Sequence, residues 1–498
     1  MRNKKIIFCL FFICLFLTSC TDVNMEKSDF NTDDTAYDTV NVKKDPDLNL
    51  AMIYEKNLNP LLVKNSENDH VMKLIYDGLF KIDENYNAIP ALAKSITYSD
   101  GGMKVLLTLK DDIKWHDYRN IVSQDVTYTL NFIRNHPESP YYSMISNIAS
   151  WEITDNKRIS LKLNSPSKTQ EFCLIFPIIP NHSGESEFVL NGNGRYMYEK
   201  NINTYTIRLK KFDAYYGSKP KINNIKIHLV SGKQEIENLF LSTDSDIADV
   251  GYQEISRYKY PIFEIIPYES RQYEMLIFNT QRPPFNMHNN RKAVICAIDR
   301  QMIINKAYHL EKSLNEIFLH DKSDLSFNKN IFAYAPEKTD KLWKTQKRKT
   351  YYLAVSKDEP LRYGAAVLIS EQLKSVAIDT EVIGLETNEL KQKLHLGNYD
   401  MALIGYRTSL SPDIMKFFKG KNLVHFNSMN LKQKEQFAAS GFEFKTEYAK
   451  LQKSFVQSAF YAGFCFTDRY AVLNSRISGK LKPNEYNIYN GIENLSIK

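Results

Sequence analysis

The side chains that usually perform covalent or metal chemistry do not form a familiar arrangement in this sequence. The ten histidines are scattered, and no two lie three or four residues apart, the spacing at which a helix presents two metal ligands. We find no convincing G-x-S-x-G, S-x-x-K or H-E-x-x-H motif and no Walker A loop, and Gly192-Asn193-Gly194 lacks the third glycine of a dinucleotide-binding turn. The sequence therefore argues against an enzyme and predicts no cofactor, while a metal site assembled from distant segments stays open.

One histidine has a suggestive neighbourhood. His116 lies between Trp115 and Asp117, just after a predicted strand and turn. An aspartate in such a turn commonly accepts hydrogen bonds from its own backbone, and a histidine beside it can satisfy a neighbouring group. We therefore expect a structural role for His116 rather than a catalytic or metal-binding one.

The amino-terminal segment carries the pattern of a secretion signal. Basic residues between positions 2 and 5 precede an uncharged apolar run over residues 6–17, which is shorter than the roughly twenty residues that a membrane-spanning helix needs. The following Leu17-Thr18-Ser19-Cys20 resembles the lipobox of bacterial lipoproteins. We therefore expect a cleaved signal peptide over residues 1–19 and an acylated Cys20 as the first residue of the mature protein; the alternative is an ordinary secretory peptide in which Cys20 is incidental.

Residues 20–47 are polar and rich in aspartate, so they bury too little apolar surface to fold and are expected to form a flexible tether. Beyond them no segment approaches eighteen uncharged apolar residues. These features predict an extracytoplasmic body that is lipid-anchored to a bacterial membrane, either at the outer face of the cell membrane or in the periplasm.

Charge and cysteine content argue against a nucleic-acid-binding protein and against a disulfide-rich protein. The 65 basic and 58 acidic residues are interspersed without a basic block, so nucleic-acid binding is not expected. Cys173, Cys296 and Cys465 are widely spaced, and none belongs to a C-x-x-C motif. They predict buried small apolar side chains rather than a disulfide framework.

Hydrophobic periodicity predicts a mixed α/β architecture. Strands are expected over residues 48–54 and 105–109, a helix is expected from an amino-terminal cap at Ser123, and two abutting helices are expected over 291–298 and after a cap at Asp299. Residues 351–406 alternate as strand, helix, strand, helix, strand, which indicates a parallel sheet with right-handed crossovers. Because ligands bind beyond the carboxyl ends of such strands, this pattern directs attention to residues 405–409.

Short motifs in a fixed order resemble the family 5 extracellular solute-binding proteins, the oligopeptide, dipeptide and nickel binders of ABC importers. The resemblance covers most of the chain and runs through Asn59–Leu61, Leu74–Leu79, Pro90–Ala93, Lys114–Asp117, Asp125–Leu130, Gly192–Tyr196, Tyr215–Ile225, Phe278–Thr280, Pro283–Phe285, Arg291–Ala293 and Ala297–Arg300. The sequence departs from the family pattern at Tyr118, Ser123 and Arg195, where glycine, alanine and proline are usual. Each motif alone is weak, but their order and spacing together are specific.

This resemblance implies an α/β fold of the periplasmic-binding-protein-like II clamshell type. Two mixed α/β lobes are joined by a hinge, and an additional domain is inserted in the first lobe. The implied division is lobe 1 (domain I) over residues 48–72, 188–268 and 467–498, inserted domain II over 73–187, and lobe 2 (domain III) over 269–466. The ligand is engulfed between the lobes, and a permease distinguishes the closed form from the open one.

The resemblance also implies a set of ligand-binding residues, namely Ser66, Tyr141, Asn279, Tyr406, Arg407 and Ser409. The first three have a structural role as their alternative. In oligopeptide binders an aspartate after the strand that ends here at Gly405-Tyr406 pairs with the amino terminus of the peptide, and Ser409 holds that position. The ammonium anchor is therefore missing unless Asp413 substitutes for it. Arg407 instead adds a cation suited to a carboxylate or another anion, with an internal ion pair or a solvated side chain as the alternative.

The main interpretation is a receptor without a catalytic step. It predicts a monomeric substrate-binding lipoprotein that captures a peptide or peptide-like solute and delivers it to the transmembrane subunits of an ABC permease. Because the missing aspartate removes the most peptide-specific feature, a metal chelate or another small solute is the alternative ligand. A ligand sensor on the same fold is a further alternative, and a surface-anchored hydrolase is disfavoured by the lack of a nucleophile motif.

Overall fold

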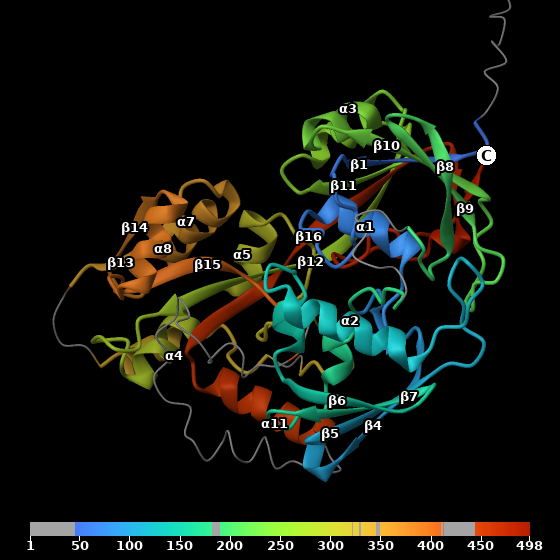
Figure 1. Ribbon diagram of the computed structural model, residues 1–498. Helices are drawn as coiled ribbons and strands as arrows, with labels where there is room; N and C mark the ends of the chain where they lie inside the picture. The colour runs from blue at the N-terminus through green and yellow to red at the C-terminus, as the bar shows by residue number, and fades with distance from the viewer. Residues whose placement is uncertain are drawn as a thin grey trace, which may run out of the picture. The chain divides into compact units, whose positions relative to one another are not determined.

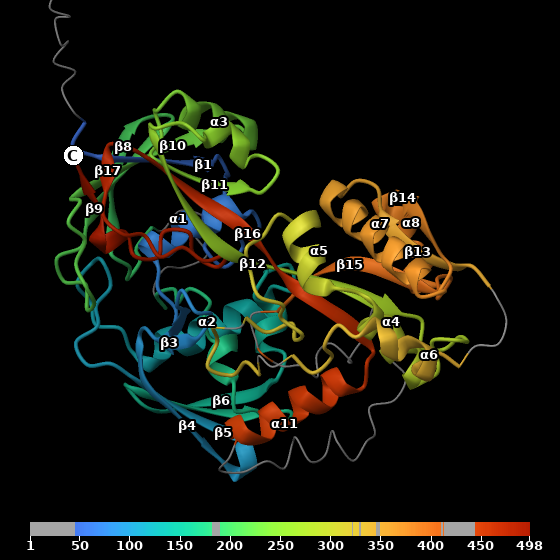
Figure 2. The same ribbon diagram turned by 180° about the vertical axis from the view of Figure 1, so that it is seen from behind.

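The computed structural model describes residues 45–181, 190–320, 322–327, 330–344, 349–409, 412 and 444–498. Within this part of the chain, Pro46–Lys498 forms one compact unit, which Figures 1 and 2 show from two sides. The expected signal peptide, the lipidated Cys20, nearly all of the tether and Asp413 lie outside the described residues. Asp47, the last residue expected in the tether, is buried, and its carboxylate pairs with Arg208 at 2.9 Å.

The first sheet forms because short alternating strands bury one apolar face. Leu48, Leu50 and Met52 are buried, as the period-two pattern predicts. The sheet has the order β1-β10-β9-β8; β1 and β10 are parallel, and the other neighbouring pairs are antiparallel. Helices α1 and α3 pack against β1. The bounds are β1 (Leu48–Ile53), β8 (Tyr196–Asn203), β9 (Thr206–Lys211), β10 (Asn224–Val230), α1 (Ser66–Ile75) and α3 (Lys233–Leu241).

A second, antiparallel sheet has the order β4-β5-β7-β6 and is accompanied by helix α2. Its members are β4 (Ala93–Ser99), β5 (Lys104–Leu109), β6 (Ile148–Asp155), β7 (Arg158–Leu163) and α2 (Ser123–Asn135), and the short pair β2 (Phe80–Ile82) and β3 (Ala88–Pro90) precedes them. The cap predicted at Ser123 is wrong, because the helix already begins there and the Ser123 hydroxyl donates to the carbonyl of Asp155 at 2.5 Å. The backbone N–H of Val122 instead donates to the carboxylate of Asp125 at 2.9 Å, which fixes the start of the helix.

The third sheet confirms the alternating pattern predicted over residues 351–406. Its order is β11-β16-β12-β15-β13-β14, and β13 lies parallel to both β14 and β15. The bounds are β11 (Ile247–Gly251), β12 (Phe263–Phe278), β13 (Tyr351–Ser356), α7 (Pro360–Ser375), β14 (Thr380–Leu385), α8 (Thr387–His395), β15 (Met401–Arg407) and β16 (Tyr461–Asn474). Ala365, Ile369 and Leu373 of α7 and Leu390 and Leu394 of α8 are buried.

Strands β12 and β16 are long and antiparallel, and they run side by side through the middle of this sheet (Figures 1 and 2). Toward Phe263, β16 also pairs with β11; toward Phe278, β12 also pairs with β15. Their register shifts between Glu269 and Tyr273 and again between Tyr273 and Met275. An irregular stretch of this kind bends a strand and re-aims its side chains.

Buried apolar residues form distinct clusters on the two sides of this irregular stretch. One cluster combines the first and second sheets, and another surrounds β13, β15 and the helices near them. In the second cluster, Asp299 caps α5 as predicted, because its carboxylate accepts the N–H of Met302 at 3.0 Å. Cys173, Cys296 and Cys465 are buried. The remaining elements are α4 (His288–Ala297), α5 (Arg300–Ala307), α6 (Thr339–Leu342), α11 (Phe444–Gln457), β17 (Ile477–Ser478) and β18 (Ser496–Ile497).

Candidate ligand-binding site

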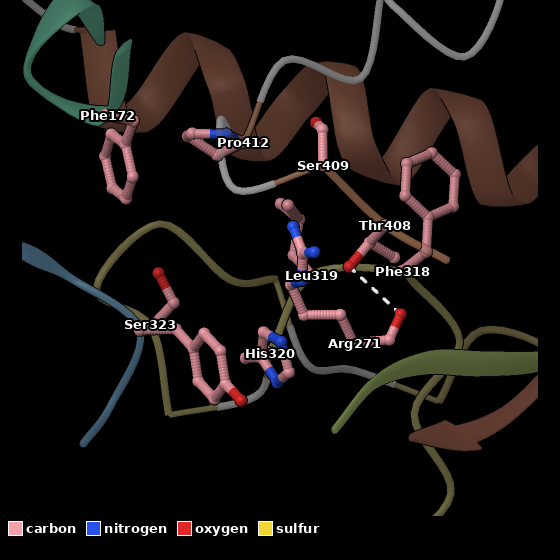
Figure 3. A pocket seen from close by; sticks show the side chains of 10 residues that line it. Phe172, Arg271, Phe318, Leu319, His320, Ser323, Thr408, Ser409 and Pro412 are labelled. Atoms are coloured by element: carbon pink, nitrogen blue, oxygen red, sulfur yellow. Dashed lines mark hydrogen bonds between the residues drawn. The ribbon is translucent and has the colours of Figure 1, made fainter. Parts of the chain in front are cut away.

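A pocket lies beside the irregular stretch of β12, where side chains from five separate segments meet (Figure 3). Its cavity volume is small, about 20 Å³, and the wider space of about 350 Å³ between its side chains includes open solvent. It is lined by Tyr86, Phe172, Arg271, Phe318, Leu319, His320, Ser323, Thr408, Ser409 and Pro412. This combination of aromatic surface with a few polar groups is typical of small-molecule sites.

Stacked rings form one wall of the pocket. Tyr86 lies in the turn between β2 and β3 with a φ of 61°, and its ring stacks on His320 with 3.5 Å between centroids. On the other side, the His320 ring stacks on Phe466 of β16 with 4.0 Å between centroids. The Tyr86 hydroxyl also donates to the carbonyl of Glu269. The stack thus ties the β2–β3 turn to the strand pair.

The carboxylate of Glu269 is saturated by cationic and polar partners behind this wall. It contacts Nδ1 of His320 at 3.0 Å and accepts from the ammonium group of Lys312 at 2.9 Å. Burial alone would raise the pKa of Glu269, but the hydrogen bonds and charges of His320 and Lys312 outweigh burial and lower this pKa to about 2. The Lys312 ammonium also pairs with Asp468 at 2.5 Å. Both carboxylate oxygens of Glu269 are therefore engaged by neighbouring side chains.

In a second cluster cationic groups outnumber carboxylates, because two arginines share the carboxylate of Glu485. The guanidinium of Arg407 pairs with this carboxylate, which also accepts the backbone N–H of Arg271. Nε of Arg271 lies 3.8 Å from the same carboxylate and makes no hydrogen bond among the described residues. Burial and, after it, the neighbouring charge of Arg407 lower the pKa of Arg271. The cluster therefore carries an excess of positive charge.

The structure brings the predicted residues after β15 to this pocket. Ser409 is exposed and lines it, as does Thr408, whose N–H donates to the carbonyl of Arg271 at 2.9 Å. Tyr406 packs edge-on against the pocket residue Phe318, with 5.7 Å between ring centroids. Arg407 is 60% exposed and makes the internal ion pair with Glu485 that the sequence left as an alternative.

The other three predicted residues lie outside the lining of the pocket. Ser66 is the exposed first residue of α1. The hydroxyl of Tyr141 is buried and donates to Asp69 at 2.9 Å. The amide of Asn279 is buried and donates at 2.9 Å to the carbonyls of Gly397 and Tyr399, so it braces the turn before β15.

His116 has the structural role expected from its position. It is buried, its Nδ1 accepts the N–H of Gly192 at 3.1 Å, and its Nε2 lies 3.1 Å from the carbonyl oxygen of Gly194. Burial lowers its pKa to about 4, so the imidazole is neutral at physiological pH. It links the loop after β5 to the start of β8.

Sequence reasoning missed much of the pocket. Tyr86 and His320 lie outside regular elements and Phe172 lies in a short 3-10 helix, Gln170–Cys173, so no hydrophobic period in the sequence marks them. Arg271 lies four residues before the short apolar run 275–278. The only signal for Arg271 would have been a charged side chain in the middle of a strand. Finding it requires a strand prediction that extends upstream of residue 275.

Within the described residues, no group of three or more histidine, cysteine, aspartate or glutamate side chains is placed to hold a metal ion. In the same part of the chain, no helix is long and apolar enough to cross a membrane.

A family model described as bacterial extracellular solute-binding proteins, family 5 Middle, matches residues 87–422. Since this match covers more than half of the chain, the protein belongs to that family. The oligopeptide-binding protein AppA of Bacillus subtilis is 20% identical over 89% of this chain and 90% of its own length. The glutathione-binding protein GsiB of Salmonella typhimurium is 24% identical over 50% of this chain and 51% of its own length. The family consists of substrate-binding transport proteins that act outside the cytoplasm.

Solved structures show the same fold. The substrate-binding protein CtaP of an ABC transporter from Listeria monocytogenes superimposes with a TM-score of 0.74 at 20% identity, over 91% of this chain and 99% of that one. NikZ from Campylobacter jejuni, solved in complex with Ni(L-His), superimposes with a TM-score of 0.64 at 20% identity, over 91% of this chain and 99% of that one. The fold is therefore the predicted α/β clamshell, with two mixed lobes joined by a hinge and an additional domain.

Proposed function

We propose that this protein is the peptide receptor of an ABC importer. In this proposal Cys20 carries the lipid anchor, and the mature protein is a monomer that encloses a peptide or peptide-like solute and presents it to the transmembrane subunits of a permease. The observation that carries the proposal is the position of the pocket. Its lining joins Tyr86 and Phe172 to Arg271 and Thr408, residues that the expected domain division assigns to domain II and to lobe 2.

The domain division itself is part of the proposal. The first sheet falls within residues 48–72 and 188–268, the second sheet within 73–187, and β13 to β15 within 269–466. The proposed boundaries at 268/269 and 466/467 fall inside β12 and β16, close to the register shifts of that strand pair. A bend at these shifts would swing lobe 2 against domain II, the domain proposed to be inserted in lobe 1, and bury a solute in the pocket.

The structure of the pocket also agrees with a passive receptor. Binding needs aromatic surface for apolar parts of a solute and a few fixed polar groups for orientation, and the lining offers both. A metal chelate or another small solute is the second candidate ligand, because Arg271 and Arg407 favour anionic groups such as the carboxylates of a chelator. A ligand sensor on the same fold and, less favoured, a surface-anchored hydrolase are the other candidates.

Native mass spectrometry of gently purified protein tests this proposal. We expect adducts with peptide masses on the wild-type protein and their loss in Ser409→Trp, because the new side chain fills the pocket that Ser409 lines. Ser150→Trp is the matched control, since Ser150 is an exposed serine on β6. Adducts of a metal chelate alone would favour the second candidate, and adducts that survive in Ser409→Trp would place the site elsewhere.

Two further assays separate the remaining candidates. Deletion of the gene should abolish uptake of the bound solute, whereas unchanged uptake would favour a sensor. Incubation with a panel of hydrolase substrates should give no turnover, since steady product formation would contradict a passive receptor. Metabolic labelling with a radioactive fatty acid should mark the protein and not its Cys20→Ser variant.

A further inference from the structure

The described lining of the pocket contains cationic and neutral polar groups but no carboxylate. Arg271 and His320 are its ionisable bases, and Ser323, Thr408 and Ser409 supply hydroxyl groups. Figure 3 shows the side chain of Arg271 pointing into the space that the other labelled side chains surround. The pocket is thus suited to accept negative charge.

The hydrogen bonding of Arg271 indicates an unfilled position. Its Nε is buried and has no hydrogen-bond partner among the described residues, and the nearest carboxylate, that of Glu485, is 3.8 Å away. Glu485 is already occupied by the guanidinium of Arg407 and by the backbone N–H of Arg271. A buried cation with an unused donor is unfavourable, and an anion that reaches it gains a charge-assisted hydrogen bond.

The other carboxylates near this region form their hydrogen bonds with other partners, and of these only Asp69 is among the charges that act on Arg271. Glu269 is held by His320 and Lys312, as described above. Asp468 pairs with the same lysine. Asp69 pairs with Lys73 and accepts the hydroxyl of Tyr141. Each of these carboxylates therefore has its own partner, and Arg271 keeps a cationic group in the lining of the pocket.

We propose that the solute presents a carboxylate to Arg271, with Arg407 and the hydroxyls of Thr408 and Ser409 beside it. The receptor then selects anionic solutes, and it holds a peptide through a free carboxylate rather than through its ammonium group. The inference rests on the proposed function as a solute receptor and assigns the chemical class of the solute at that site.

Peptide pools with altered ends test the inference. The purified protein is titrated with a tetrapeptide library of Ala, Gly, Leu, Ser and Phe in three forms: both ends free, carboxyl end amidated, and amino end acetylated. Bound peptide is quantified by native mass spectrometry. Loss of a charge-assisted hydrogen bond predicts that amidation weakens binding about tenfold to hundredfold, while acetylation leaves it nearly unchanged. Equal binding of the amidated and free pools would overturn the inference and leave the receptor proposal standing.

Variants test whether Arg271 causes the preference for peptides with a free carboxyl end. Arg271→Gln should bind the free pool as weakly as the amidated one, Arg271→Lys should retain part of the discrimination, and Arg407→Gln should reduce it less. The matched control is Arg257→Gln, because Arg257 is 62% exposed and ion-paired with Glu237 as Arg407 is with Glu485. Circular dichroism verifies that each variant is folded. An Arg271→Gln protein that still prefers the free pool would overturn the inference.

A third arm separates this inference from the proposed peptide transport. The same proteins are titrated with citrate and with nickel citrate. Binding that depends on Arg271, without binding of any peptide pool, would support carboxylate selection and overturn the peptide receptor. Failure of the peptides, citrate and nickel citrate alike to bind would overturn both proposals.

Discussion

Arg300 and Arg271 differ in how completely their guanidinium groups are bonded. Arg300 donates to the carboxylate of Glu316 and to the carbonyl of Phe332 at 2.6 Å each, and to the carbonyl of Gly463 at 3.1 Å. The side chains of Arg300 and Glu316 are both 3% exposed. Arg271 shares one carboxylate with another arginine and keeps a buried donor unused. An arginine with filled donors holds the fold together, whereas one with an open donor beside a pocket is available to a solute.

The largest expected effect on stability follows from removing the carboxylate that pairs with Arg300. Glu316→Ala leaves Arg300 buried without its counter-ion, so the free energy of unfolding should fall by about 3–5 kcal/mol. Urea denaturation measures this change. The control Glu237→Ala removes an exposed pair with Arg257 and should cost no more than about 1 kcal/mol. If the two variants lose the same amount, the comparison between filled and open arginines does not hold.

Acid should reduce the stability that the carboxylate of Glu269 contributes to the fold. The folded pKa of Glu269, about 2, lies below its ordinary value of 4.5, so the unfolded chain binds more protons between these values. Stability therefore falls as the pH drops from about 5 to 2, by at most about 3 kcal/mol from this group.

Urea unfolding at pH 5 and pH 3 tests this expectation. Glu269→Gln should show a smaller decrease in stability over that range than the wild-type protein. Asp468 shares the partner Lys312, and burial and the charge of Glu269 raise its pKa, so the variant reports the loss of Glu269 together with the resulting change at Asp468. Parallel decreases in both proteins would assign the acid sensitivity to other groups.

Removal of Arg271, whose Nε has no hydrogen-bond partner among the described residues, should hardly change stability. Arg271 is repelled by Arg407, and its Nε forms no hydrogen bond among the described residues, so Arg271→Gln should change the free energy of unfolding by no more than about 1 kcal/mol. Thermal and urea unfolding of the solute-free protein measure it. A loss as large as that of Glu316→Ala would show that Arg271 is as structural as Arg300.

The smallest effect is expected for Arg407→Gln. The Arg407 side chain is 60% exposed, and the guanidinium and backbone N–H of Arg271 stay beside the 8% exposed carboxylate of Glu485, so the change should be within about 0.5 kcal/mol. Urea denaturation at low and high salt measures it. A salt-independent loss above that value would mean that the pair with Glu485 is a structural bond between segments.

The sequence predicted the regular elements best where apolar spacing was strong. The strands and helices over residues 351–406 and the cap at Asp299 were found because their patterns are local. Only residues 275–278 of β12 were recognised, because the middle of this strand carries Glu269, Arg271 and Gln272. That stretch is extended because β16 and β15 pair with it, and such pairing is not visible in a local window.

The candidate site was predicted in part for the same reason. The rule for the carboxyl ends of parallel strands led to Ser409 and its neighbours. The opposing wall depends on Tyr86 and His320, which are far apart in sequence and meet through ring stacking. Glu485, which organises the two arginines, lies in a loop near the carboxyl end of the chain, and nothing in its local sequence relates it to Arg271.

The late position of β16 in the chain has a consequence for biogenesis. This strand is inserted between β11 and β12, so the sheet that supports the pocket is incomplete until residues 461–474 have been made. Long-range pairing of this kind delays folding, because distant segments must first be brought together. A nascent chain therefore lacks a finished site until nearly all of it has been synthesised.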